Sequence, residues 1–339
     1  MEKERKIRRI AVFTALAFLV VLGFFLSITI GNVSISFKEA MLVLTGNGDF
    51  KNAAIITDIR LPRVIMTFIL GGALAVSGFL LQTYFANPIA GPYILGISSG
   101  AKMAVAVLLI FITTSTGRTS SMMLVLAAFV GAVISTFFII MISRAVRNMG
   151  ILLAAGIMIG YICSAITDFL IAFADDSDIV NLHGWSQGSF SGTDMGTVKY
   201  AAGIVFVTLV SVMLLSKALD ALRLGETYAK SVGVNVKVCR VLVILFSSVL
   251  SACVTAFAGP ISFIGIAVPF LVRELLKSSK PIVLVPASFL AGSVFCMFSD
   301  LLARQMFAPT ELNISAVTSL FGAPIVIYMM VRRRGNNET

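Results

Sequence analysis

The sequence predicts an all-α polytopic membrane protein with about ten transmembrane helices in a single domain, residues 1–339. Two observations support this fold class. First, 58% of the residues are hydrophobic, only 12% are charged, and the mean hydropathy is +1.00. A soluble domain of this size cannot bury so much apolar surface, because its exterior needs polar cover. Second, apolar runs long enough to cross a bilayer recur along the chain, without a composition break that would mark a second domain.

Ten apolar runs are candidate spans. The first lacks a small-residue cleavage site, so we interpret it as a retained helix and not as a signal peptide. The run at 261–276 is short for a span. The ten runs lie near residues 10–30, 64–85, 93–112, 121–143, 150–173, 199–216, 240–258, 261–276, 282–303 and 313–331.

The distribution of Lys and Arg predicts the orientation in the membrane. An even number of spans puts both termini on one side, and the segments on that side carry 18 Lys and Arg residues, whereas the opposite loops carry seven. Cytoplasmic loops of membrane proteins are enriched in these residues, so both termini are predicted to be cytoplasmic. The net charge of +10 is therefore interpreted as membrane orientation and not as nucleic-acid binding.

The stretch from Asp58 to Ala101 contains the densest set of motifs. Arg60-Leu61-Pro62-Arg63 precedes an apolar run, and proline in a first helical turn loses no hydrogen bond. Asn87-Pro88 and Gly91-Pro92 end the run, because proline lacks the N–H donor and restrains the residue before it. The small residues of Gly96-Ile97-Ser98-Ser99-Gly100 follow, and such residues let helices approach closely in lipid.

Two of the breaks resemble one another and hint at an inverted repeat. Ala90-Gly91-Pro92 follows the second span and Ala258-Gly259-Pro260 follows the seventh; each leads into a segment containing Gly-Ile. Because the two spans run in opposite directions, the breaks are expected on opposite faces of the membrane. Interrupted helices at matching places in two halves are typical of transporters. Gly91, Pro92, Gly259 and Pro260 are therefore candidate hinge or pathway residues.

Catalytic and metal-binding motifs are weak. The chain has no Gly-Lys pair and so lacks a phosphate-cradling loop for ATP hydrolysis. Gly-Ile-Ser98-Ser-Gly fits a nucleophile motif, but that motif needs a histidine partner, and the one histidine, His183, falls in a predicted external loop. A membrane-embedded hydrolase remains an alternative that requires both residues. The four cysteines sit singly in apolar runs and are expected to be small buried residues.

Ion-coupled transport is a second alternative. It needs ionisable groups inside the membrane, where they are costly and usually functional. Only Asp168 and Lys102 fall clearly inside predicted spans. This is a small set for a proton or sodium relay, so a transporter energised by another protein is favoured. Asp168 is kept as a candidate pathway residue.

Several motifs form a set that covers nearly the whole chain. Besides Arg-x-Pro-Arg, Asn-Pro-x-Ala-x-Pro and Leu-Gly-x-Ser-Ser-Gly-Ala, they include Leu-Gly-Glu-x-x-Ala-x-x-x-Gly-Val at 224–234 and Val-Pro-Phe at 268–270. The set resembles the membrane subunits of ABC importers for iron–siderophore complexes, haem and vitamin B12. That family usually has histidine where this chain has Phe270, so the polar role of that histidine is not transferred.

The resemblance implies a permease subunit in the cell membrane of a prokaryote. Its expected cargo is an iron(III)–siderophore complex, with haem or cobalamin as the alternative. The expected partners are two ATPase subunits, an extracytoplasmic substrate-binding protein, a second permease copy or paralogue, and membrane lipid. ATP and Mg would bind to the ATPase subunits, and no catalytic residue, cofactor or metal is expected on this chain itself.

The resemblance also assigns docking and coupling residues. Arg60, Arg63 and Arg304 match positions that receive glutamates of the binding protein, a task that suits the planar guanidinium. The alternatives from the residues alone are interfacial snorkelling for Arg60 and Arg63, and an i,i+4 ion pair with Asp300 for Arg304.

The cytoplasmic segment at about 217–240 matches the family's ATPase-coupling segment. Within it a short helix is predicted, ending at a glycine. The alternative is an ordinary basic loop held by anionic lipid headgroups. The coupling residues implied by the motif are Gly225, Glu226, Ala229, Gly233 and Val234.

Overall fold

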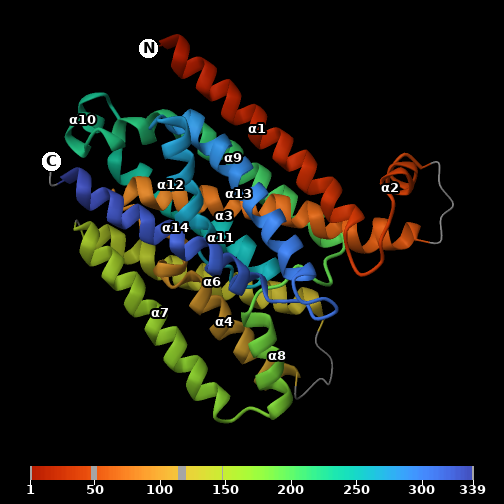
Figure 1. The fold of residues 1–339 in the computed structure, drawn as a ribbon. Helices are drawn as coiled ribbons and strands as arrows, with labels where there is room; N and C mark the ends of the chain where they lie inside the picture. Colours follow the sequence, from red (N-terminus) through yellow and green to blue (C-terminus); the bar gives the residue numbers. More distant parts are fainter. Residues whose placement is uncertain (1, 47–51, 114–119, 147, 338–339) are drawn as a thin grey trace.

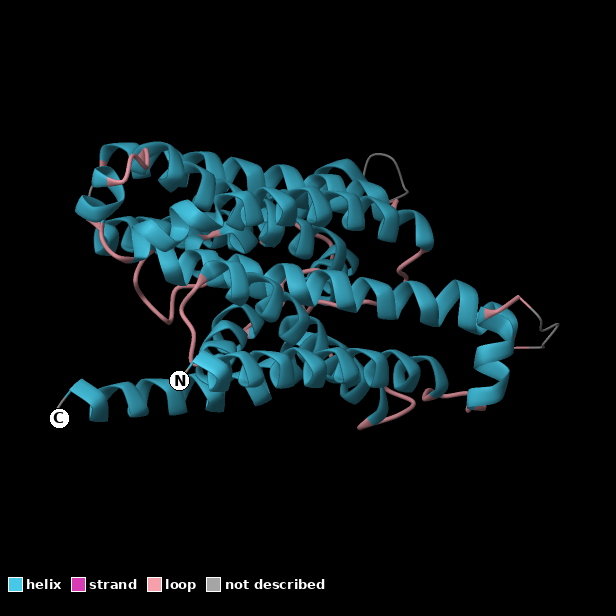
Figure 2. Cartoon of the chain, turned by 90° about the horizontal axis from the view of Figure 1, so that it is seen from above, coloured by secondary structure: helices cyan, strands magenta, loops and turns pink. Residues whose placement is uncertain are grey.

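The computed structural model describes residues 2–46, 52–113, 120–146 and 148–337. Within these ranges every regular element is a helix, and the long helices pack side by side in one bundle (Figure 1; Figure 2). The all-helical prediction is therefore confirmed. Lys51, Arg118 and Arg147, which entered the charge comparison, lie outside the described residues.

In the described part of the chain, eight helices are long and apolar enough to cross a membrane. Two further predicted spans correspond to shorter helices. One is the apolar α4 (Ile97–Val107), which continues as the π-helix η3 (Leu108–Thr113), and the other is α12 (Ile264–Leu276). The count of ten spans stays a prediction. The eight long helices are α1 (Glu2–Thr29), α3 (Leu61–Tyr84), α6 (Ser121–Ala145), α7 (Met149–Ile171), α9 (Met195–Arg223), α11 (Val236–Ala258), α13 (Pro281–Gln305) and α14 (Ile314–Asn337).

Short helices lie at the two ends of the bundle. In Figure 1 the ends of the described chain and α10 (Glu226–Ser231) lie toward one end of the bundle, and α2 (Phe37–Leu44) lies at the other. The π-helix η1 (Ile55–Arg60) leads into α3, and α8 (Asp176–Ser186) connects α7 to the segment before α9. Both termini thus share an end with α10, and which side of the membrane this end faces stays a prediction.

The two proline-containing breaks shorten the helices that follow them. After the 3₁₀ turn η2 (Pro92–Leu95), Gly96 has φ +73° before α4 begins, and Phe263 has φ +65° before α12 begins. A side chain at Gly91 would place its Cβ 2.8 Å from Cγ1 of Ile266 in α12. Gly259 has φ +73°, and a Cβ there would lie 2.6 Å from the carbonyl oxygen of Trp185. Close packing and backbone conformation thus explain both break glycines, and the hinge role of Gly91, Pro92, Gly259 and Pro260 remains a prediction.

Helix α3 lies at the centre of the bundle, with 83% of its apolar window buried against α9, α11, α12 and α13. Its glycines allow this close contact. A Cβ at Gly78 would overlap the carbonyl oxygen of Gly265 in α12, and one at Gly71 would overlap Cys296 in α13. Gln82 on the same helix donates from Nε2 to the carbonyl of Ile266 at 3.0 Å. All four cysteines are free and buried, as the sequence predicts.

Replacing Gly78 with alanine is expected to destabilise the protein by about 3 kcal/mol, because α3 and α12 must move apart around a backbone carbonyl that cannot give way. The matched control is Gly203→Ala in α9, where no described atom lies within 4 Å of the added Cβ. The control should leave stability within about 0.5 kcal/mol of wild type. Thermal unfolding in detergent measures both, and equal midpoints for the two variants would contradict this packing.

Candidate functional site

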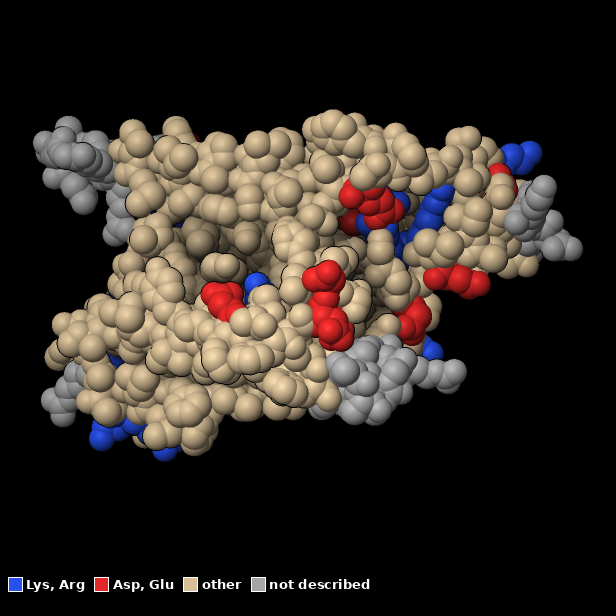
Figure 3. Space-filling view, turned by 90° about the horizontal axis from the view of Figure 1, so that it is seen from below, with Lys and Arg blue, Asp and Glu red and all other residues tan. Residues whose placement is uncertain are grey.

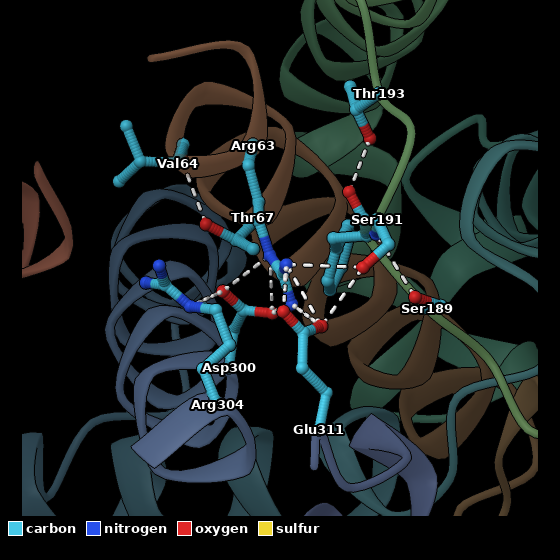
Figure 4. A network of polar contacts seen from close by, with 10 residues as sticks. Arg63, Val64, Thr67, Ser189, Ser191, Thr193, Asp300, Arg304 and Glu311 are labelled. Atoms are coloured by element: carbon cyan, nitrogen blue, oxygen red, sulfur yellow. Dashed lines mark hydrogen bonds and ion pairs between the residues drawn. The ribbon is translucent and has the colours of Figure 1, made fainter. Parts of the chain in front are cut away.

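A cluster of charged side chains joins four segments at the α2 end of the bundle (Figure 4). Arg63, in the first turn of α3, donates from Nη2 to Asp300 Oδ1 at 2.9 Å and to Glu311 Oε2 at 3.1 Å. Ser191, in the segment before α9, donates to the same Glu311 oxygen at 3.0 Å. Arg304 Nε lies 3.2 Å from Asp300 Oδ2 as an ion pair without hydrogen-bond alignment. We call these five residues the Arg63 cluster.

Burial divides the Arg63 cluster into an inner and an outer part. The side chains of Asp300, Arg304 and Arg63 are 4%, 9% and 11% exposed, whereas Glu311 is 42% exposed. A buried carboxylate must be paired, since losing its partner leaves an uncompensated charge. Asp300 is therefore the structural centre, and Glu311 is the member that can leave Arg63 at lower cost. Charged side chains are sparse on the face in Figure 3, and most of its acidic ones lie in the right half.

Arg60 makes different contacts from its neighbour Arg63. It is 6% exposed, and its Nη1 donates to the carbonyls of Ile28 at 2.5 Å and Thr29 at 3.1 Å, while Nη2 donates to the carbonyl of Val33. The last carbonyls of a helix have no partner within the helix, so Arg60 caps the C-terminus of α1. These contacts support a structural role, and docking at Arg60 remains a prediction without a contact that favours it.

Glu311 gives the Arg63 cluster a pH dependence. Partial burial raises the pKa of Glu311, but the hydrogen bonds and positive charge of Arg63 outweigh this and hold the pKa below its ordinary value. A carboxyl whose folded-state pKa is depressed stabilises the fold above its unfolded pKa, and loses this contribution as pH falls through the folded value.

We therefore expect wild type to melt at a higher temperature than Glu311→Gln at neutral pH. The difference should shrink as the pH falls below the ordinary glutamate pKa of 4.5, because protonation removes the charge that Arg63 attracts. Differential scanning calorimetry of the two proteins in detergent, from pH 7 downward, measures this difference in melting temperature. A difference that stays constant over the acidic range would show that the charge of Glu311 is not its source.

At the opposite end, the predicted coupling segment forms a short helix, α10, which ends at Ser231 and is capped by Gly233. The N–H of Val234 donates to the carbonyl of Ala229 at 2.9 Å, and that of Gly233, with φ +83°, to the carbonyl of Lys230 at 3.1 Å. This pair of bonds is a Schellman motif. Ala229 is fully buried, and Gly225 enters the helix with φ +116°. These four positions of the motif therefore shape α10 and hold it against the bundle.

Arg240, in the second turn of α11, ties α10 to three other helices. Its Nη2 donates to Glu226 Oε1 at 2.8 Å, and its Nη1 lies 3.4 Å from the carbonyl of Val146 and 3.5 Å from that of Ser143, at the end of α6. Its guanidinium also lies over the Tyr84 ring at the end of α3, 5.8 Å from the centroid. The Arg240 side chain is 14% exposed. Glu226 thus connects α10 to the ends of α3, α6 and α11 through one cation.

The remaining candidates do not form a catalytic or metal site. Ser98 is buried, and its Oγ lies 3.4 Å from Oγ1 of Thr255. His183 lies in α8, where its Nε2 is 3.1 Å from Nε2 of Gln187. Each side chain thus has another partner, and the two do not form a nucleophile–base pair. Among the described residues, no group of three His, Cys, Asp or Glu could hold a metal ion. Asp168 lies on the exposed face of α7, and Phe270 is partly buried in α12.

Two residues that the structure places in these networks were not singled out from the sequence. Glu311 lies in the stretch Pro309-Thr310-Glu311-Leu312-Asn313, so an acidic residue in a loop near Arg304 was a usable signal. Arg240 entered only as one of the positive charges near the predicted membrane boundary. Apart from Glu226, which is 14 residues away, its partners come from helices far apart in the sequence, so no local spacing could reveal the network.

Comparison with known proteins identifies the class of transporter. The chain is 32% identical over 309 residues to the Hemin transport system permease protein HmuU of Yersinia pestis, covering 91% of each chain. It is 35% identical over 279 residues to the Vitamin B12 import system permease protein BtuC of Vibrio vulnificus, covering 82% of this chain and 83% of the relative.

A solved structure described as an inward-facing conformation of a metal-chelate type ABC transporter has a TM-score of 0.84 to this fold. It is 26% identical, and the match covers 95% of this chain and 99% of that one. Residues 19–332 match the FecCD transport family. The match spans both the Arg63 cluster and α10, and the chain belongs to the FecCD transport family, as a multi-pass permease of a binding-protein-dependent ABC importer.

Proposed function

We propose that this permease carries an iron(III)–siderophore complex, with haem or cobalamin as the alternative cargo. The proposal rests on the resemblance of the chain's motifs to importers of iron–siderophore complexes, haem and vitamin B12, and the family match over residues 19–332 supports a permease of this type. The named relatives transport haemin and vitamin B12, and the similar solved structure is of the metal-chelate type. All these cargoes are metal complexes held by a large organic ligand, so passage requires a wide pathway and no covalent step by the permease.

We propose that two partner ATPase subunits bind ATP and Mg and drive the transport, with α10 as the element that meets them. Two features support this role for α10. It is a compact helix closed by a Schellman motif, and it shares an ion pair with α11 through Glu226 and Arg240. A rigid element connected to several spans can pass a displacement from the ATPase to the pathway. ATP binding would thus move α10 and change which side of the pathway is open.

We propose that the substrate-binding protein docks at the α2 end, with a glutamate side chain paired to Arg63 and a second contact near Arg304. Arginine pairs with carboxylates through two parallel hydrogen bonds. The contacts that support the proposal are those of Arg63 with two carboxylates, of which Glu311 is the exposed one. An arriving carboxylate would replace Glu311 and leave the buried pair with Asp300 intact.

A second permease copy, identical or paralogous, is the proposed partner of α7 and α14. The apolar window of α7 is 17% buried and that of α14 28%; those of α1 and α9 are exposed to the same extent, at 17% and 28% buried, so it is Asp168 that distinguishes α7. Asp168 lies on the exposed face of α7, and a carboxylate facing lipid is costly. A pathway between two copies would give Asp168 a polar environment.

Uptake by cells that depend on this permease tests the cargo. A strain lacking the chromosomal gene should lose accumulation of a ⁵⁵Fe-labelled siderophore and regain it with the wild-type gene, while uptake of haemin and of labelled cobalamin should be unchanged. Loss and rescue of haemin or cobalamin uptake alone would instead assign the alternative cargo. No change for all three classes would contradict the proposed cargo range.

A further inference from the structure

A cavity of about 720 Å³ lies between the end of α6, helix α10 and the start of α11. Four cationic side chains line it, against one carboxylate, that of Glu226. The cations are Arg144, Lys230, Lys237 and Arg240. The cavity lies beside the Arg240 contacts described above but is lined by a larger set of residues from three elements.

The charge in the cavity is not balanced within the described chain. Glu226 is paired with Arg240 at 2.8 Å, which accounts for the carboxylate. Arg144, Lys230 and Lys237 are exposed, and the buried Nε of Arg240 makes no hydrogen bond to the described residues. Three cations and one unused donor therefore line a hollow that has room for an anionic group.

The apolar wall of the cavity indicates what kind of anion fits. Val238, Val241 and Leu242 line the same space, and they belong to α11, one of the eight helices apolar enough to span a membrane. Val238 is 52% exposed. The cations sit where α6 ends and α11 begins, at the level where a span meets the membrane surface, and basic pockets between spans at this level suit lipid headgroups.

We propose that this cavity binds one anionic phospholipid, with its phosphate among Arg144, Lys237 and Arg240 and an acyl chain along Val238 and Leu242. An acidic protein segment would meet the cations, but it would place polar backbone against the aliphatic wall of a transmembrane helix. A phospholipid satisfies both surfaces. Because Lys230 belongs to α10, the bound lipid would also hold α10 against the ends of α6 and α11.

The test uses the purified transporter with its partner subunits, stripped of endogenous lipid and titrated in native mass spectrometry. The probes are phosphatidylglycerol and phosphatidylcholine with the same acyl chains. Wild type should bind one phosphatidylglycerol at least about tenfold more tightly than phosphatidylcholine, since each basic residue near an anionic headgroup contributes about 1 kcal/mol. Arg144→Gln/Lys237→Gln should lose this preference. The matched control, Lys277→Gln/Lys280→Gln, removes two exposed lysines between α12 and α13 and should retain it.

Three results would overturn the proposal. Equal affinity of wild type for the two lipids would show that charge does not select the occupant. Displacement of phosphatidylglycerol by millimolar inorganic phosphate would show that the acyl chain contributes nothing. Retention of the lipid preference by Arg144→Gln/Lys237→Gln together with loss of the ATPase subunits would assign the cavity to the protein interface.

Discussion

Arg63→Glu is expected to abolish substrate uptake while the ATPase subunits keep their basal activity. The substitution removes the cation between Asp300 and Glu311 and places a third carboxylate beside them, with Arg304 as the remaining ion-pair partner in the cluster. Breaking a buried pair in this way costs about 3–5 kcal/mol. Under the docking proposal it also repels the binding protein. Uptake and ATP hydrolysis by the reconstituted transporter measure the two effects separately.

Lys199→Glu is the matched control for this charge reversal. Lys199 is an exposed cation in the second turn of α9, close in sequence to Ser191 of the cluster. Its reversal changes the net charge by the same amount, and transport should stay near the wild-type rate. Equal loss of uptake in both variants would mean that the overall charge of this end matters and not the Arg63 cluster.

Glu311→Gln separates docking from folding. It removes the exposed partner of Arg63 but leaves the buried Asp300 pair, so the protein should fold. If an incoming carboxylate replaces Glu311, removing this competitor should raise the affinity for the binding protein by about threefold, the value of an exposed ion pair. An unchanged dissociation constant would argue against docking on Arg63 while leaving the structural role of the cluster intact.

Arg240→Gln is expected to reduce transport per ATP hydrolysed by about tenfold, which corresponds to about 1.4 kcal/mol of lost coupling. The variant loses the ion pair with Glu226 and weakens the contacts with the end of α6, so α10 can move without moving the spans. The measurement is the ratio of substrate transported to ATP consumed in proteoliposomes. A lower ratio at normal hydrolysis identifies uncoupling, whereas parallel loss of both rates would not.

Arg223→Gln is the control for this second prediction. Arg223 pairs with Asp220 at 3.3 Å within the last turn of α9, and the two side chains are 36% and 40% exposed. An exposed pair of this kind contributes little, so the ratio should stay within about twofold of wild type. If Arg223→Gln and Arg240→Gln lower the ratio equally, the loss comes from positive charge near α10 and not from the connection through Arg240.

Features that depend on neighbouring residues could be predicted from the sequence. The end of α10 just before Gly233 follows from the preference for glycine in the left-handed position after a helix. The ion pair of Asp300 with Arg304 follows from their i,i+4 spacing on one helix and is confirmed. The family resemblance is likewise confirmed, because its motifs are local and lie along nearly the whole chain.

Features that depend on helix packing could not be predicted in this way. Arg63 and Glu311 are 248 residues apart in the sequence, and Arg240 meets α6 across 94 residues. Hydropathy also could not separate long spans from short helices. The apolar run 93–112 begins inside the 3₁₀ turn Pro92–Leu95 and then passes through Gly96, and these turn conformations leave only an 11-residue α4 before η3. The length of an apolar run therefore does not give the length of the helix within it.

Purification of the tagged protein from its native membrane in mild detergent tests the central claim most directly. Mass spectrometry should recover an ATPase subunit with a phosphate-cradling Gly-x-x-x-x-Gly-Lys loop near a one-to-one ratio to the permease. Substituting Glu226 removes the ion pair of α10, and substituting Gly233 removes its Schellman cap; both changes should weaken that recovery. A permease that is recovered alone and still transports its cargo on an ion gradient would contradict the account and turn attention to Asp168 and Lys102.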